Sequence, residues 1–129
     1  MRIRETIAAF ALPLALTATP AAAQPLSGPE IREKIGGELV RLSTPYGLTL
    51  PLVYRDDGVV AGDISGFSIG ALLAPSEEGR WWVKDDRLCQ KWPTWYDGRT
   101  YCFTITALGP NRIAWTRDDG LSGTATMGR

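Results

Sequence analysis

The stretch 79–115, which reads GRWWVKDDRLCQKWPTWYDGRTYCFTITALGPNRIAW, most constrains how this chain can fold, because it holds all five tryptophans and both cysteines. Apolar and polar residues alternate on either side of short turn sequences, as in antiparallel strands with one face in a core. If Cys89 lies opposite Cys102, Leu88 faces Phe103 and the charged residues around Cys89 face threonines. A slip of one residue would destroy this agreement. We therefore predict a hairpin closed by a Cys89–Cys102 disulfide.

Two further strands follow from the same alternation. The sequence 109–111, Gly-Pro-Asn, has turn chemistry, and a turn there sets Ile105 opposite Trp115. A second turn at 118–120, Asp-Asp-Gly, leads into a strand that sets Trp115 over Gly123. An aromatic ring covers a glycine well because the glycine has no side chain of its own to pack. The sequence thus predicts a three-stranded meander with a shared apolar face.

Residues 1–23 have the features of a secretory signal peptide. Two arginines precede an apolar run at 7–16, and three alanines at 21–23 supply the small residues that a cleavage site requires. The apolar run is too short for a membrane-spanning helix. We expect a single β-barrel-like domain over 24–129, with no membrane span, located in the periplasm or secreted. Two cysteines in an exported chain favour one structural disulfide.

A short helix is predicted directly after the signal peptide. Ser27 and Glu30 form a capping-box pattern with a proline in the first turn, and Gly36 and Gly37 end the helix. Ile31 and Ile35 lie on one face, and the helix is so short that it needs support from a sheet. We expect it to plug one end of the structure.

The segments 38–43, 48–55 and 59–64 read as strands separated by turn sequences, and Pro51 marks the second as an edge or bent strand. The segment 65–79 is compatible with a strand and loop, or with a mobile flap. About eight short strands result, with turn signals every 8–12 residues. The predicted fold is mainly β: a small antiparallel barrel or sandwich-like meander with one short N-terminal helix.

Composition excludes several function classes. The chain has no histidine, so Ser-His and Cys-His nucleophile pairs and histidine metal sites are impossible. Three Asp-Asp pairs lie in predicted turns and do not match the spacing of a calcium loop. Without residues 1–23 the net charge is about −1, and no basic stripe is present, which argues against nucleic acid as a partner. We predict no catalytic residue, no metal ligand and no cofactor, and hence no enzyme.

The loop at 93–98 is the best candidate for a binding site. Trp95 and Tyr96 are adjacent, so both cannot face one core in a regular strand, and Trp92 and Arg99 flank them. We take Trp92, Trp95, Tyr96 and Arg99 as candidate ligand-binding residues. An aromatic tip with a charged rim resembles a protein-binding hot spot or a stacking platform for a sugar. Alternatively, these aromatics fold back over a barrel mouth as packing.

Three functions are compatible with these features. The first is a small periplasmic binding or inhibitory module for an unknown protein or small-molecule ligand. The second is a structural envelope protein without a ligand. The third and least favoured is a carbohydrate-active enzyme that uses carboxylates alone, for which no sequence spacing gives support. The sequence does not indicate the oligomeric state.

The layout of the chain resembles that of small exported proteobacterial proteins without an assigned activity. The shared features are a Leu-Ser-Gly-Pro-Glu-Ile helix at 26–31, a Gly-x-Trp-x-Val strand at 79–83, the two cysteine strands, and a final Asp-Gly-x-x-Gly hairpin at 119–123. The Gly-x-Trp motif also resembles the lipocalin signature, although in lipocalins it lies in the first strand and here it lies mid-chain. The resemblance implies a calycin- or lipocalin-like β-domain and transfers no functional residues.

Overall fold

The computed structural model of the protein describes residues 23–43, 47, 49–63 and 76–128. Within these residues the chain forms one α-helix, one 3-10 helix and eight strands. Their bounds are α1 Gly28–Ile35, β1 Glu38–Ser43, β2 Thr49–Tyr54, β3 Val59–Asp63, β4 Ser76–Lys84, β5 Arg87–Lys91, η2 Trp95–Gly98, β6 Thr100–Gly109, β7 Arg112–Arg117 and β8 Ser122–Met127.

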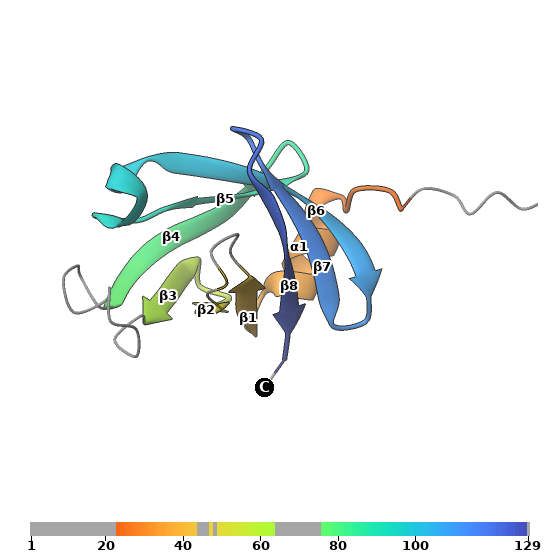
Figure 1. Ribbon diagram of the computed structural model, residues 1–129, viewed down its shortest axis with the longest axis horizontal. Coiled ribbons are helices and arrows are strands. Elements are labelled where there is room, and N and C mark those ends of the chain that lie inside the picture. Colours follow the sequence, from red (N-terminus) through yellow and green to blue (C-terminus); the bar gives the residue numbers. More distant parts are fainter. Residues whose placement is uncertain (1–22, 44–46, 48, 64–75, 129) are drawn as a thin grey trace, which may run out of the picture.

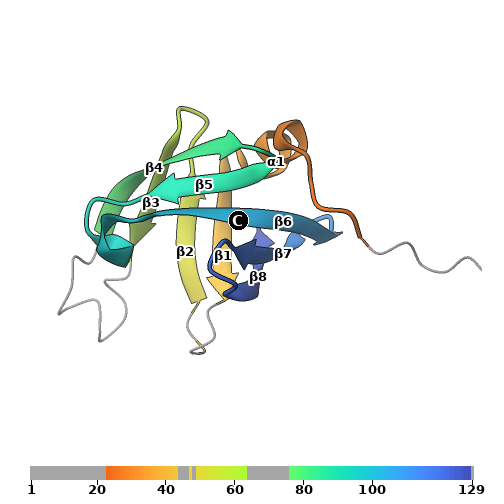
Figure 2. The same cartoon turned by 90° about the horizontal axis from the view of Figure 1, so that it is seen from above.

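The eight strands form a closed antiparallel barrel (Figures 1 and 2). Each strand pairs with the next along the chain, and β1 pairs with β8 to close the sheet. Of the two predicted architectures, the barrel is therefore confirmed. Closure leaves no unpaired strand edge, which removes the most common route to edge-to-edge aggregation.

The predicted registers of the central strands are confirmed. Cys89 lies opposite Cys102, with Cα atoms 4.0 Å apart, and the two form a disulfide. Leu88 pairs with Phe103, and further along the sheet Trp115 pairs with Gly123. A Cβ atom added at Gly123 would come within 2.6 Å of the Trp115 ring, so only glycine leaves room for this indole.

The structure refines two strand predictions. Strand β4 begins at Ser76, inside the segment 65–79 that was expected to form a strand and loop or a flap, while residues 64–75 lie outside the described ranges. Pro51 was expected to mark an edge or bent strand, and the edge alternative is wrong, because β2 pairs with both β1 and β3. Pro51 lies one residue beyond the last β2–β3 pair, Leu52 with Gly62, so its missing N–H falls outside that paired stretch.

Helix α1 closes one end of the barrel. Its capping box is present: Ser27 Oγ accepts from the backbone N–H of Glu30, and Glu30 accepts from the backbone N–H of Ser27. The helix lies against two of the turns at this end. The N–H of Gly28 donates to Asp86 at 2.7 Å, and Lys34 Nζ donates to the carbonyl of Gly109 at 3.3 Å.

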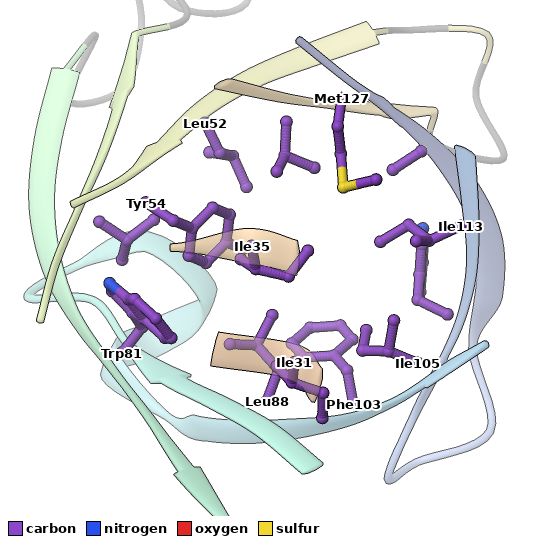
Figure 3. Packing of buried hydrophobic residues seen from close by; sticks show 14 of the residues in the cluster. Ile31, Ile35, Leu52, Tyr54, Trp81, Leu88, Phe103, Ile105, Ile113 and Met127 are labelled. Carbon is purple, nitrogen blue, oxygen red and sulfur yellow. The ribbon is translucent and has the colours of Figure 1, made fainter. Parts of the chain in front are cut away.

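The barrel interior is filled with side chains. Ile31 and Ile35 of α1 are fully buried and lie among inward-pointing residues of the strands, as Figure 3 shows. A buried polar pair lies in the interior, in which the Tyr54 hydroxyl donates to Gln90 at 2.7 Å. A cavity beside this pair measures about 20 Å³, enough for roughly one water molecule. An eight-stranded barrel is just wide enough for side chains to fill it or to hold one small ligand, and here the side chains fill it.

Candidate binding site at the β5–β6 loop

The loop between β5 and β6 lies at the end of the barrel opposite α1, where Figures 1 and 2 show it as a short teal coil. Its 3-10 turn η2 contains two consecutive non-glycine residues with left-handed backbone, Tyr96 and Asp97, both at φ 57°. Gly98 follows at φ 64°. A left-handed conformation is rare for a bulky residue such as tyrosine, and it persists only where the surroundings impose it.

The two tryptophans of the predicted site lie on the barrel rather than in solvent. Trp92 was expected to contact a ligand, but it is 1% exposed and belongs to the core. The Trp95 ring packs on it with ring centroids 4.6 Å apart. Trp95 also fills the space above Gly62, where an added Cβ would come within 2.5 Å of the indole. The Trp92 Nε1 atom has no hydrogen-bond partner among the described residues.

Tyr96 turns the other way, onto β6 and β7. Its ring makes an edge contact with Tyr101, with centroids 6.0 Å apart. The Arg117 guanidinium lies 4.2 Å from the Tyr101 centroid and 5.9 Å from that of Tyr96, so both rings share one cation. Asp119 accepts two hydrogen bonds from Arg117, at 2.8 and 2.6 Å. These hydrogen bonds hold the pKa of Asp119 at about 2.

Glu77 of β4 anchors the base of the loop. Its carboxylate accepts hydrogen bonds from the backbone N–H groups of Thr94 and Trp95, each at 3.1 Å, and from the Thr94 hydroxyl. Burial raises the pKa of Glu77, but these hydrogen bonds outweigh burial, and the pKa lies below its ordinary value. The loop is thus fixed from two sides, by Glu77 near Trp95 and by Arg117 beneath Tyr96.

The solvent-facing tip of the loop includes Tyr96, Asp97 and Arg99, and Pro93 and Thr94 at its base are exposed as well. Tyr96 is 37% exposed despite its contact with Tyr101, and both Asp97 and Arg99 are exposed. The backbone N–H of Arg99 donates to the carbonyl of Tyr96 at 3.1 Å, which closes the turn. Of the four candidate residues, the structure therefore brings Trp92 and Trp95 together as packing and leaves Tyr96 and Arg99 at the surface.

Sequence reasoning missed the residues that hold this loop. Neither Glu77 nor Arg117 was among the residues predicted for the site. The repeated Arg-Asp-Asp-Gly sequence at 55–58 and 117–120 is the one available signal. In both copies the arginine pairs with the second aspartate, as Arg55 does with Asp57. Only the second copy lies beside an aromatic loop.

No protein-family model, curated protein or solved structure was found to match this chain. In the residues that the structure describes, no group of three or more Cys, Asp or Glu side chains is placed to hold a metal ion. None of the helices described is long and apolar enough to cross a membrane. The disulfide is compatible with an exported protein.

Proposed function

We propose that this protein is an exported, periplasmic or secreted binding or inhibitory module that recognises a protein partner through the tip of the β5–β6 loop. We place the binding site on the outer surface of the barrel, because the interior cavity of about 20 Å³ is too small for an organic ligand. The proposed contacts are Tyr96 and Arg99. Tyrosine and arginine are enriched in the residues that dominate binding energy at protein interfaces.

The left-handed backbone at Tyr96 and Asp97 carries this proposal. Both residues lie at the exposed tip of a loop that Glu77 and Arg117 hold in place. Strained backbone that the surroundings enforce is concentrated at functional sites. A loop held in one conformation also loses less entropy when it binds, which favours recognition over a purely structural role.

The experiment compares the purified protein with the double variant Tyr96→Ser/Arg99→Ser on a biosensor surface, with soluble envelope extract of a Gram-negative bacterium as the analyte. We expect the specific binding signal of the double variant to be at least ten-fold lower than that of the wild-type protein. The control variant Arg112→Ser, at an exposed residue of β7, should retain it. Melting temperatures of all three proteins show whether each is folded. Equal signals from folded wild-type protein and loop variant contradict the proposal.

The structural envelope protein is the second candidate, and the filled interior favours it. It predicts that no envelope component is retained by the wild-type protein in the same experiment. It also predicts that the loop substitutions act only on the melting temperature.

A further inference from the structure

The outer face of the β4–β5 hairpin collects positive charge. Strand alternation turns every second residue of each strand away from the core, and the four cationic residues of this face stand in two directly opposed pairs. Arg80 pairs with Lys91 at one end, and Lys84 pairs with Arg87 at the other. Trp82 lies between them, opposite Cys89. Figures 1 and 2 show the two strands side by side.

None of these four cations forms an ion pair in the part of the chain that the structure describes, although Glu78 lies on the same face two residues before Arg80, and Asp85 and Asp86 form the turn beside Lys84 and Arg87. The two ion pairs formed there are Arg55–Asp57 and Arg117–Asp119, which lie elsewhere. Like charges directly opposite one another destabilise a sheet. Cationic residues often protect the free edge of a sheet, but in a closed barrel neither β4 nor β5 is an edge. The whole chain has a formal net charge of zero, so the cluster is a local separation of charge.

The face is also shaped to receive a ligand. An open hollow of about 450 Å³ lies at the Arg80–Lys91 end of this face and does not reach Lys84 or Arg87. Its lining residues are Glu78, Gly79, Arg80, Trp82, Lys91, Trp92 and Pro93. Trp82 is only half-buried, so part of its indole is free to stack. The disulfide from Cys89 to β6 ties the centre of the hairpin to the next strand and keeps the face rigid.

The size of the face limits what it binds. Four residues of strand separate the two cationic pairs, or about 13 Å, and the strands lie about 4.8 Å apart. The area between these four backbone positions is therefore about 60 Å², well below the roughly 800 Å² that each partner buries in a stable protein interface. A peptide cannot add as an extra strand because the barrel is closed. A concave surface also fits a chain-like ligand better than it fits a flat lipid bilayer.

We propose that the outer face of β4–β5 binds an acidic polysaccharide. One sugar ring stacks on the Trp82 indole, and the acidic groups of neighbouring sugars pair with the cations at the two ends of the face. Arg80 and Lys91 hold one acidic group, and Lys84 and Arg87 hold the next. This site adjoins the base of the β5–β6 loop at Pro93 but does not include Tyr96 or Arg99. It recognises charge and a ring, with no requirement for a protein partner.

The test is a titration of the purified protein with a hexamer of mannuronate, a uniformly acidic oligosaccharide, followed by calorimetry and tryptophan fluorescence. We expect binding that weakens as salt is added, because exposed charges are screened. The variant Arg80→Glu/Lys91→Glu should bind at least ten-fold more weakly. The control Arg32→Glu/Arg112→Glu makes the same charge change on exposed residues off this face and should bind as the wild-type protein does. Trp82→Leu should weaken binding several-fold and leave its salt dependence unchanged.

Three outcomes overturn the proposal. The first is no binding of the hexamer at millimolar concentration by the folded wild-type protein. The second is equal binding of cellohexaose, an uncharged hexamer, or equal losses in the test and control variants. The third is tighter binding of single-stranded DNA or of phosphatidylglycerol vesicles than of the hexamer, which assigns the face to another class of partner. Melting temperatures establish that each variant is folded.

Discussion

The two ends of this barrel are closed in different ways. At one end α1 inserts Ile31 and Ile35, both fully buried, into the core. At the other end the β5–β6 loop lays Trp95 over the sheet and is anchored by hydrogen bonds to Glu77. The first closure rests on apolar burial together with hydrogen bonds from Gly28 and Lys34 to two turns. The second uses polar anchors and keeps an aromatic ring, that of Tyr96, partly exposed. The two ends therefore differ in how much of the closing element is inserted into the core.

Truncation of the helix side should have the largest effect on stability. Ile35→Ala removes a fully buried side chain from the core, and we expect it to lower the free energy of unfolding by about 2–5 kcal/mol. Urea unfolding measures the change. Glu33→Ala, at an exposed position of the same helix, is the control and should cost much less. If the two substitutions cost the same, α1 does not close the barrel by burial.

A substitution beneath the loop should have an intermediate effect. Gly62→Ala places a methyl group within 2.5 Å of the Trp95 ring, and we expect a loss of about 1–3 kcal/mol together with a red shift of tryptophan emission as the ring is displaced. Gly109→Ala is the matched control, because an added Cβ there has no neighbour within 4 Å. An unchanged emission maximum in Gly62→Ala would show that Trp95 does not rest on β3.

Removal of the anchor charge should have the smallest effect. Glu77→Gln weakens the hydrogen bonds to Thr94 and Trp95, and we expect a loss of about 1–2 kcal/mol at pH 7. The neighbouring Glu78→Gln is the control, because Glu78 is exposed and accepts no hydrogen bond among the described residues.

The same pair of variants tests the pH dependence of the anchor. The pKa of Glu77 is lowered in the folded protein, so its stabilising contribution is complete above its unfolded pKa and is lost as the pH falls through its folded pKa. The difference in unfolding free energy between wild-type protein and Glu77→Gln should therefore shrink below about pH 4. A difference that stays constant down to pH 2 excludes the carboxylate as the anchor.

Most of the fold could be predicted, because the sequence patterns that specify strands, turns and the helix are local or repeat along the chain. Strand alternation and turn residues determine which faces are apolar, and one consistent register then follows for Cys89 with Cys102 and for Trp115 with Gly123. The capping box at Ser27 and the spacing of Ile31 and Ile35 likewise act within a few residues of one another. The start of β4 within the segment 65–79 could not be predicted, because Glu77, Glu78 and Gly79 are poor strand formers whose preference the barrel pairing overrides.

The meander of β5 to β8, the disulfide and the helix that closes one end could be predicted from the chain, since each depends on neighbouring residues or on a single period. The choice of a barrel over a sandwich and the closure of its other end emerge only in the folded protein. They depend on the pairing of β1 with β8 and on the contacts of Trp95 with Gly62 and of Glu77 with Thr94, which join residues far apart in the sequence. The tertiary structure also decided where charge gathers. Along the sequence, three uncharged residues separate the two cations of each strand, so no basic run is visible. The pleat of the strands and the β4–β5 pairing bring Arg80, Lys84, Arg87 and Lys91 onto one face.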